Sequence, residues 1–504
     1  MAEVPRRDEP TDAGPASARA GLSLVDAATA VDGRLVPYEP GRLTLTEVSC
    51  DSRDAMAPGT IFAAVPGSVT DGHRFVEAAV AAGASAVMVE RAQEGLEVPQ
   101  LVVADVRAAV GPLAQAVAGH PAQSLQLIGV TGTNGKTTFV TLLAALLGRL
   151  GVRAEAFGTL TGARTTPEGP DLARQLRAAA DTGVQAVAME VSSHALALHR
   201  VDGLVFDLVV FTNLGRDHLD FHATQEEYFA AKARLFEPER ARHGLLCVDD
   251  VHGRLLADAA GALPVSAYSV EDLDEVSLSA TGSRFSWRGH TVSVAVAGRF
   301  NLANVLAALE AAVLLGHPAE AVARAADGLE GPPGRFQVVE AAPGEDAAPA
   351  VIVDYAHSPD ALAGALDSAR ELVGDGHLTV VFGCGGDRDR AKRPAMGRVA
   401  AERADRVIIT SDNPRNEDPL AIAESVAQGS AEVSPTPPEI ELDRRRAIRT
   451  ALASAADGSL VLVAGKGHET TQTFADRVEP FDDAVVVAEE RAHLSGPAAG
   501  EDRA

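Results

Sequence analysis

Cysteine is scarce in this sequence of 504 residues: only Cys50, Cys247 and Cys384 occur, at spacings that fit neither a metal site nor a disulfide framework. So few cysteines are typical of a reducing compartment, and we expect a cytoplasmic location. Long apolar runs are also lacking, so no membrane span is predicted. The first residues have prolines and glycines but no apolar centre like that of a signal peptide, and residues 1–21 are predicted to be a disordered tail.

Basic residues are in deficit as well. The sequence has 44 lysines and arginines against 70 aspartates and glutamates, for a formal net charge of −26. Because no block rich in lysine or arginine offsets this charge, the sequence argues against a nucleic-acid partner. Apolar residues make up 46% of the chain, which over this length is enough for two to four domains with hydrophobic cores.

The most informative stretch that is present is a glycine-rich loop, residues 129–138, between a predicted strand and a predicted helix. The backbone N–H groups of such a loop and the helix that follows it bind phosphate. We expect Lys136 to reach the β- and γ-phosphates of a nucleotide and Thr137 to ligate Mg²⁺. The glycines fall three residues apart, and Val130 replaces the commoner P-loop glycine. The flanking elements nevertheless favour a nucleoside triphosphate site over an ordinary turn.

Strand-like and helical patterns alternate along the chain, which predicts an α/β protein of three domains. We place a small N-terminal α/β domain at residues 22–122 and a central P-loop ATPase domain with a parallel sheet at 123–334. A C-terminal Rossmann-like domain is predicted at 335–504. The Gly/Pro-rich residues 331–334 read as the linker before it, and as a hinge.

Polar clusters follow two predicted strands of the central domain. Glu190 begins one cluster and His218 lies in the other, at the sheet edge where parallel α/β sheets bind ligands. Both are suitable Mg²⁺ ligands, although either alone is equally explained as a hydrogen-bonded loop residue. Lys232 lies on an amphipathic helix, where composition alone indicates a surface lysine. Asn301 and Asn304 suit either a helix cap or contact with a base edge.

Glycine-rich or polar loops also follow four predicted strands of the C-terminal domain. Arg388 and Arg415 lie in two of these loops and are candidates to clamp a carboxylate, with surface ion pairs as the alternative. The loop at residues 383–386 lacks the G-x-G-x-x-G spacing, so no redox cofactor is predicted.

Four motifs in chain order, at residues 132–138, 190–194, 212–220 and 354–359, resemble those of the Mur ligases. These are ATP-dependent amide-forming enzymes of peptidoglycan precursor synthesis, and the resemblance covers nearly the whole chain beyond residue 20. It implies a ligase that serves cell-wall biogenesis, cell shape and cell division. It also implies ATP as co-substrate, Mg²⁺ as cofactor and an acyl-phosphate intermediate. We expect a monomer.

The resemblance assigns roles residue by residue. Those implied to bind ATP are Gly132, Thr133, Asn134, Gly135, Lys136, Thr137, Thr138, Asn301, Asn304 and Arg335. Those implied to hold metal are Thr137, Glu190, His218 and Lys232, the last as N6-carboxylysine, a carbamate. The implied catalytic set is Lys136, Lys232, Glu190, His218, His357 and Asp354. The residues implied to hold the UDP-sugar peptide are Ser52, Thr165, Thr166, Ser192 and Arg200. Those implied to bind the incoming amino acid are Arg388, Asp412, Asn413, Pro414, Arg415, Gly465 and Glu469.

The stretch Asp412–Arg415 is similar to the signature of members that add 2,6-diaminopimelate to UDP-N-acetylmuramoyl-L-alanyl-D-glutamate. The second carboxylate of diaminopimelate suits the planar fork of Arg415. Leu198 and Arg164 depart from versions of the family pattern that have glutamine and asparagine there. The alternatives are a lysine-adding relative, a folylpolyglutamate synthase-like ligase and, in another class, an NTP-dependent switch.

Overall fold

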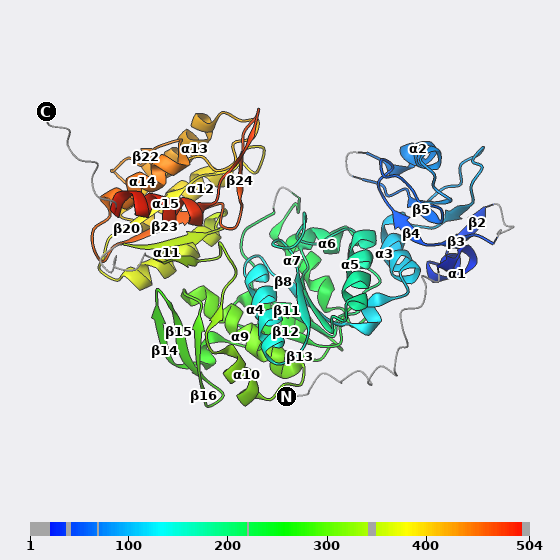
Figure 1. Cartoon of the computed structure of the whole chain (residues 1–504), viewed down its shortest axis with the longest axis horizontal. Helices are drawn as coiled ribbons and strands as arrows, with labels where there is room; N and C mark the ends of the chain where they lie inside the picture. The colour runs from blue at the N-terminus through cyan, green and yellow to red at the C-terminus, as the bar shows by residue number, and fades with distance from the viewer. Residues whose placement is uncertain (1–20, 37–41, 68–69, 219–220, 341–348, 496–504) are drawn as a thin grey trace.

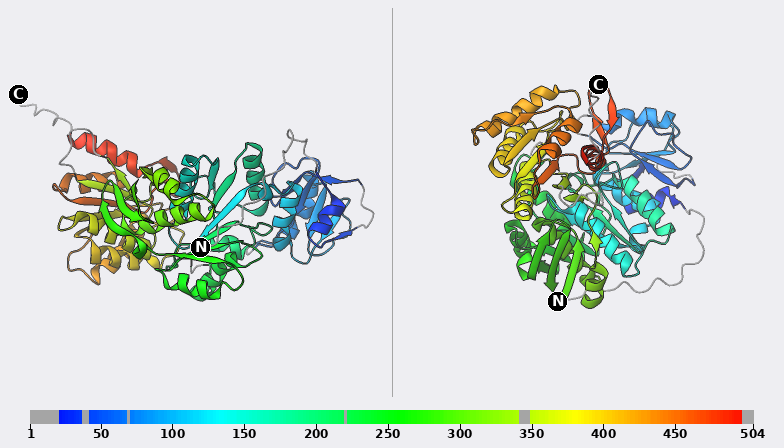
Figure 2. Two further views of the ribbon diagram at one scale, coloured as in Figure 1. Left: turned by 90° about the horizontal axis from the view of Figure 1, so that it is seen from below. Right: turned by 60° about the vertical axis from the view of Figure 1, so that its left-hand side comes forward.

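The computed structural model describes residues 21–36, 42–67, 70–218, 221–340 and 349–495, which form three lobes (Figure 1). The first and third lobes lie at opposite ends of the molecule, with the second between them (Figure 2). Residues 1–20 of the predicted tail, and Leu219 and Asp220 of the motif at 212–220, lie outside the described residues. Within the described ranges, no helix is long and apolar enough to cross a membrane.

The first lobe is built on a five-stranded sheet in the order β2-β7-β6-β5-β4. Its strands are β2 (Arg34–Val36), β4 (Glu47–Ser49), β5 (Thr60–Ala63), β6 (Ala86–Val89) and β7 (Gln100–Val102). Its helices are α1 (Leu24–Ala30), α2 (Val76–Ala81) and α3 (Val106–Val117), and β1 (Leu22–Ser23) pairs with β3 (Thr44–Leu45). Only β2 runs antiparallel to its neighbour in the five-stranded sheet. The lobe packs on the second where Gly169 closely approaches Gly111 of α3.

The second lobe contains a parallel six-stranded sheet in the order β13-β12-β11-β8-β10-β9. Its strands are β8 (Gln126–Thr131), β9 (Ala154–Phe157), β10 (Ala186–Glu190), β11 (Leu208–Phe211), β12 (Gly244–Cys247) and β13 (Val265–Tyr268). The main helices are α4 (Lys136–Arg149), α5 (Gly169–Asp181), α6 (Ser193–Ala197), α7 (Gln225–Ala233), α8 (Val251–Ala259), α9 (Arg299–Leu314) and α10 (Ala319–Ala326). Because β8 lies between β10 and β11, the loops after all three strands meet at one edge.

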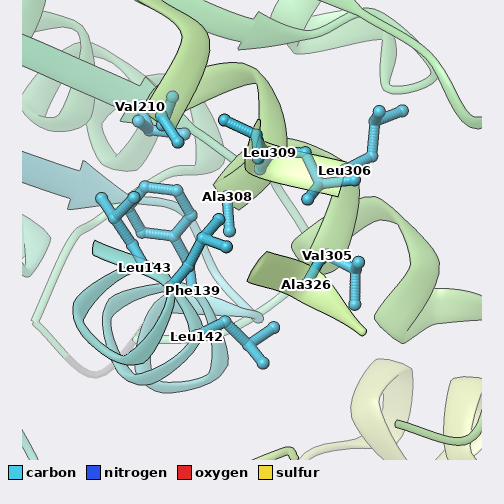
Figure 3. Close-up of a cluster of buried hydrophobic side chains, with 14 of the residues drawn as sticks. Phe139, Leu142, Leu143, Val210, Val305, Leu306, Ala308, Leu309 and Ala326 are labelled. Atoms are coloured by element: carbon cyan, nitrogen blue, oxygen red, sulfur yellow. The ribbon is translucent and has the colours of Figure 1, made fainter. Parts of the chain in front are cut away.

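One of the two hydrophobic clusters of this lobe is formed by α4 and α9 against the sheet (Figure 3). The α4 side chains include Phe139, Leu142 and Leu143, and those of α9 include Val305, Leu306 and Leu309. Burial of these apolar side chains holds α4 in place. The packing extends to the glycine loop: Gly135 has φ of +90°, and a Cβ there would collide with the Asn304 side chain. Glycine is therefore required at the start of α4.

A small sheet beside this core was not predicted from the sequence. It joins β14 (Asp274–Ser279), β15 (Gly282–Trp287), β16 (His290–Ala295) and β17 (Leu329–Glu330). Phe285 and Trp287 of β15 are buried in the same cluster as α9. The Trp287 indole N–H donates to Glu310 Oε1 at 2.9 Å, which ties this sheet to α9.

The third lobe has a six-stranded sheet in the order β18-β19-β23-β20-β21-β22, parallel except for β18. Its strands are β18 (Gln337–Val339), β19 (Ala350–Asp354), β20 (Leu378–Phe382), β21 (Arg406–Ile409), β22 (Glu439–Ile440) and β23 (Leu460–Ala464). Around it lie α11 (Pro359–Val373), α12 (Lys392–Arg403), α13 (Pro419–Ala431), α14 (Arg444–Ser454), α15 (Asp483–Ser495) and the hairpin β24 (Thr471–Thr473)–β25 (Val478–Pro480). The predicted α/β class is confirmed, with a parallel central sheet and a Rossmann-like third lobe.

Two polar contacts hold the third lobe against the second. The Arg299 guanidinium of α9 pairs with the Glu371 carboxylate of α11 at 2.8 Å. The Asp360 carboxylate, at the start of α11, accepts the backbone N–H of Arg216 at 2.5 Å. Loops at the ends of the second-lobe and third-lobe sheets therefore face a common space.

Candidate active site

The glycine loop holds two lysine side chains on one carbonyl oxygen. Lys136 Nζ, at the start of α4, and Lys232 Nζ, on α7, each donate to the Gly132 carbonyl at 2.8 Å. Lys136 also donates to the Thr133 carbonyl at 2.9 Å. Lys232 is fully buried and lies over the Tyr228 ring, 4.4 Å from its centroid. Burial, and then the nearby Lys136 charge, hold the pKa of Lys232 well below its usual value, which favours the neutral amine.

The loop after β11 braces the glycine loop. The Thr212 hydroxyl donates to the Asn134 carbonyl at 2.6 Å, and the Asn213 side-chain oxygen accepts the Asn134 N–H at 3.0 Å. A Cβ at Gly132 would collide with Thr212, so this brace needs glycine there. The loop is thus held in one shape by neighbouring strands, as a preorganised phosphate site requires.

Thr137 and Glu190 form the wall beside Lys136. The Thr137 hydroxyl donates to Glu190 Oε1 at 3.0 Å, and the Thr159 N–H donates to the same oxygen at 2.8 Å. Among the described side chains, no three His, Cys, Asp or Glu converge on a metal position. This hydroxyl–carboxylate pair still fits Mg²⁺, which takes one or two protein ligands and completes its shell with water and substrate phosphate.

His218 lies on the same cavity wall and has a φ of +56°. Burial lowers the pKa of His218 to about 4, against a smaller opposing effect of Asp217. The imidazole is therefore neutral at pH 7 and can donate a lone pair to a metal. Its ring meets that of His194 edge-on, with centroids 4.8 Å apart.

A cavity of about 550 Å³ joins these residues. From the second lobe it is lined by Thr133, Asn134, Gly135, Lys136, Thr137, Thr138, Glu190, His218 and Lys232, together with Thr165, Thr166, Ser192 and Arg200. The linker and the third lobe contribute Arg335, Tyr355, His357 and Arg388. Residues implied to bind the triphosphate, the sugar peptide and the amino acid therefore share one space.

Arg335 connects the linker to the glycine loop. Its guanidinium donates to the Thr137 hydroxyl at 3.2 Å and lies over the Tyr355 ring, 4.2 Å from the centroid. His357 Nδ1 donates to the Tyr355 carbonyl at 2.9 Å, which in the neutral ring leaves Nε2 as an acceptor. Burial, and then Lys392, lower the pKa of His357 and so favour that neutral ring.

Asp354, which is expected to be catalytic, binds backbone N–H groups in this structure. Its oxygens accept the backbone N–H groups of Phe336 at 2.7 Å and Ala356 at 2.8 Å, and it is not on the cavity wall. Because Phe336 follows Arg335 and Ala356 precedes His357, this carboxylate positions both side chains. Asn301 and Asn304 also lie off the wall: they are buried, and Asn304 Nδ2 donates to Asn301 Oδ1 at 3.2 Å behind Gly135.

The four residues of the second lobe that the resemblance implies hold the sugar peptide lie together. The Thr166 hydroxyl donates to the Glu190 carbonyl at 2.9 Å and accepts the Ser192 N–H at 3.1 Å. The Arg200 guanidinium donates to the Thr166 carbonyl at 3.2 Å, and the Thr165 hydroxyl lies 3.1 Å from that of Thr159. Glu190 therefore links two sets of residues: its backbone carbonyl contacts Thr166, and its side chain contacts Thr137 beside the glycine loop.

A second cavity, of about 370 Å³, lies at the junction of the first two lobes. Arg164 and Arg200 line both cavities, and Leu198 lines this one. Asp51 is on its wall, whereas the neighbouring Ser52 occupies a turn that is not. The two positions that depart from the family pattern thus face the same space.

The residues implied to bind the amino acid meet at the carboxyl ends of the strands in the third-lobe sheet. Asn413 Nδ2 donates to Glu469 Oε2 at 2.7 Å, and a Cβ at Gly465 would lie 3.1 Å from Asp412 Oδ2. Arg415 follows Pro414 and donates from Nη1 to the Gly386 carbonyl at 2.7 Å. Within this group, Arg388 is the residue that also lines the larger cavity.

Sequence reasoning missed Lys392 and Lys466. Lys392 Nζ donates to the His357 carbonyl at 2.7 Å, and Lys466 Nζ lies 3.1 Å from Glu469 Oε2. A signal was available: with Lys136 and Lys232 these are the four lysines of the whole sequence, so 44 minus four leaves 40 arginines. Every lysine therefore touches the site or a residue assigned to it.

Two partly buried histidines predict a loss of stability in acid. Burial lowers the pKa of both His218 and His468 to about 4, from an ordinary 6.5. Between these values the unfolded chain binds more protons than the folded one, so stability falls as pH drops from 6.5 to 4. We expect His468→Gln to lessen that fall by about 1 kcal/mol, allowing for partial exposure. Urea unfolding at pH 7, 5.5 and 4.5 measures the free energy of unfolding. If that free energy falls equally with pH in the native protein and in His468→Gln, the lowered pKa of His468 is not its cause.

Three models of Mur ligase domains match the chain. They are the Mur ligase family catalytic domain over residues 44–164, the Mur ligase middle domain over 130–312 and the Mur ligase glutamate ligase domain over 334–467. Curated relatives from Streptomyces coelicolor and Synechococcus elongatus are 42% and 44% identical. The first alignment covers 93% of this chain and 96% of the relative, and the second 88% and 93%.

Both relatives are named UDP-N-acetylmuramoyl-L-alanyl-D-glutamate–2,6-diaminopimelate ligase. A solved structure of the same name is 35% identical, with a TM-score of 0.64, over 90% of this chain and 96% of that one. This level of identity over nearly the full length, together with the three domain models, shows that the chain belongs to the Mur ligase family.

Proposed function

We propose that this protein is an ATP-dependent ligase that adds 2,6-diaminopimelate to UDP-N-acetylmuramoyl-L-alanyl-D-glutamate, forming ADP and phosphate in peptidoglycan precursor synthesis. The observation that carries the proposal is the larger cavity. Its wall includes the glycine loop, the pair Thr166 and Arg200, and Arg388. The relatives of that name, matched along nearly their whole length, support the same reaction.

The first step is phosphoryl transfer. A terminal carboxylate oxygen of the sugar peptide attacks the γ-phosphorus of ATP, the bond to the bridging oxygen breaks, and an acyl phosphate and ADP result. Lys136, at the base of the loop, neutralises charge on the β- and γ-phosphates. Thr137 and Glu190 are the residues suited to hold Mg²⁺, with His218 on the same wall; when bound, the ion supplies charge neutralisation at the phosphates.

The second step is attack by the amine. The neutral amino group of diaminopimelate adds to the acyl carbon, the carbon–oxygen bond to phosphate breaks as the tetrahedral intermediate collapses, and the proton that the nitrogen loses leaves with the phosphate. Arg415 and Arg388 bind the far carboxylate, and Glu469 receives the far ammonium group. His357 Nε2, on the cavity wall, is an acceptor close to the triphosphate group, and Asp354 keeps it there.

Lys232 acts in this proposal as a carbamate. Its neutral amine attacks carbon dioxide and loses a proton to water, which gives a carboxylate-like anion suited to Mg²⁺. Two observations support this: the buried Nζ lines the cavity, and Lys136 beside it disfavours a second positive charge. Lys232 is therefore a metal ligand in this proposal, and not the surface lysine that composition alone indicates.

The three lobes correspond in the proposal to three substrates. Residues 22–122, with Ser52, bind the UDP-sugar; 123–334 bind ATP, Asn301 and Asn304 lying on the adenine side; and 335–504 bind the amino acid. Residues 331–334 are the hinge, and closure excludes water from the acyl phosphate. We propose a cytoplasmic monomer.

The alternatives each predict a different site. A lysine-adding enzyme has no use for the Arg415 fork, and a folylpolyglutamate synthase-like ligase has none for the UDP-sugar lobe. An NTP-dependent switch has no reason to hold Asn413, Arg415 and Glu469 together at the edge of a second sheet. Diaminopimelate ligation accounts for all three groups.

Phosphate release tests the proposal. ATP, Mg²⁺ and UDP-N-acetylmuramoyl-L-Ala-D-Glu are supplied with meso-diaminopimelate, LL-diaminopimelate or lysine in parallel. Release that requires either diaminopimelate is the expected result, and it also identifies the preferred isomer. Release with lysine alone would mean that Asp412–Arg415 does not select the second carboxylate. Amino-acid-independent release would favour the switch.

A further inference from the structure

The Lys466 ammonium is enclosed by the third lobe. Its side chain has no exposed surface, and Nζ donates to the Thr471 carbonyl at 2.6 Å, to Glu469 Oε2 at 3.1 Å and to Asn413 Oδ1 at 3.4 Å. An ammonium has three N–H donors, and these three acceptors account for all of them. Lys466 is therefore fully committed to its own lobe and has no donor left for a ligand.

Two of the three acceptors belong to side chains that the proposed function assigns to the amino acid. Asn413 Nδ2 donates to the same Glu469 Oε2 at 2.7 Å, and Asn413 Oδ1 also accepts the Thr473 N–H at 2.9 Å. Lys466, Asn413 and Glu469 thus close a three-membered ring of contacts. Since both contacts to Glu469 use Oε2, the other carboxylate oxygen is the one available to an incoming ammonium group.

The electrostatics of the ring depend on Lys466. Burial alone would raise the pKa of Glu469, but Lys466, followed by the Asn413 amide, more than offsets it and the pKa is lowered. The second buried cation of this region, Arg444, is already paired with Asp483 through two contacts of 2.7 Å. Lys466 therefore makes the largest contribution to lowering the pKa of Glu469.

The choice of residue is itself informative in this chain. Arginine fills 40 of its 44 lysine and arginine positions, so a lysine at this position is an uncommon choice for this chain. A planar guanidinium presents its donors in a fork, whereas the acceptors here belong to a strand carbonyl, a carboxylate and an amide around one point. A compact ammonium suits that arrangement.

We infer that Lys466 is a positioning residue of the amino-acid site, which holds Asn413 and Glu469 in the geometry that receives the far ammonium of the incoming diamino acid. This inference rests on the proposed function, because it concerns the substrate that the third lobe binds. Lys466 does not touch the substrate. Its effect is on how well the diamino acid binds and not on the triphosphate or the sugar peptide.

Steady-state kinetics of Lys466→Met test this inference. Methionine keeps much of the side-chain length but removes the charge and the donors. We expect the KM for diaminopimelate to rise about 10- to 100-fold, as a displaced binding group produces. The KM values for ATP and the UDP-sugar dipeptide are expected to stay within about twofold, and kcat to change less than the KM for diaminopimelate. Lys466→Arg should not restore the KM, because the fork does not fit.

Arg449→Met is the matched control. Arg449 lies on α14 in the same lobe and pairs with Glu490, away from the site, so its loss should leave all three KM values unchanged. A folded Lys466→Met with a native KM for diaminopimelate, or with all three KM values raised alike, would overturn the inference. Should that variant not fold, Lys466→Gln decides by the same criteria. A native enzyme that ignores diaminopimelate would overturn the proposed function as well, whereas native turnover with an unaffected Lys466→Met overturns this inference alone.

Discussion

Replacing Lys232 by alanine is expected to reduce ligation at least about 1,000-fold, because the proposed carbamate is then lost from the metal side of the cavity. A short carboxylic acid such as formate or acetate should restore at least about tenfold of that loss. Truncation of this buried side chain leaves room on the cavity wall for a small carboxylate. That carboxylate supplies the oxygens that the carbamate would have provided. Phosphate release over a series of acetate concentrations measures the rescue.

Lys136→Ala is the matched control for this experiment. Lys136 Nζ contacts the same Gly132 carbonyl as Lys232 but acts in the proposal as a cation, so acetate should not rescue its loss. Carbon-13-labelled bicarbonate gives an independent readout, since a carbamate resonance is expected in the native protein and not in Lys232→Ala. An active Lys232→Ala, or equal rescue of both variants, would exclude the carbamate role.

Arg415→Lys is expected to lower kcat/KM for diaminopimelate about 100- to 1,000-fold, while the KM for ATP stays near its native value. The Arg415 guanidinium is fixed by Gly386, and its backbone N–H donates to the Thr473 carbonyl at 3.0 Å, so the fork is held ready. A lysine keeps the charge but presents one point where diaminopimelate needs a bidentate partner. The preference for diaminopimelate over lysine should narrow accordingly.

Arg398→Lys provides the comparison for that substitution. Arg398 is an exposed residue of α12 paired with Glu432, so the same change there should leave the kinetics unaltered. The measurement is phosphate release with diaminopimelate and with lysine over a range of concentrations. Native selectivity in Arg415→Lys would mean that Arg388 alone recognises the second carboxylate.

The proposed reaction depends on contacts between lobes as much as on any one loop. Arg335, just after the linker, donates to Thr137, and Asp354 accepts the backbone N–H groups of Phe336 and Ala356, the neighbours of Arg335 and His357. The proposed hinge is therefore followed directly by a residue that contacts Thr137. A change in the position of the third lobe would move Arg335 and His357 together.

The sequence by itself determined the elements around the glycine loop. The apolar strand, the loop at 129–138 and the apolar helix after it appear as β8, the loop and α4, and the strand before Glu190 also lies where predicted. These features are local: a run of buried residues, a glycine or a polar strand end carries its own signal over a few positions. The α/β class follows from the same alternation.

Only the tertiary structure decided the rest. Nothing near Lys466 in the sequence indicates that its ammonium contacts Asn413, 53 residues away. The sequence around Asp354 likewise does not indicate that both of its carboxylate oxygens accept backbone N–H groups. Asn301 and Asn304 read equally well as caps or ligands until α9 is packed against Gly135. The β14–β17 sheet needs Leu329 to pair with Val294 across the intervening α9 and α10. Each of these depends on chain segments that meet only when the sheets and helices pack, and short-range pattern holds no information about that meeting.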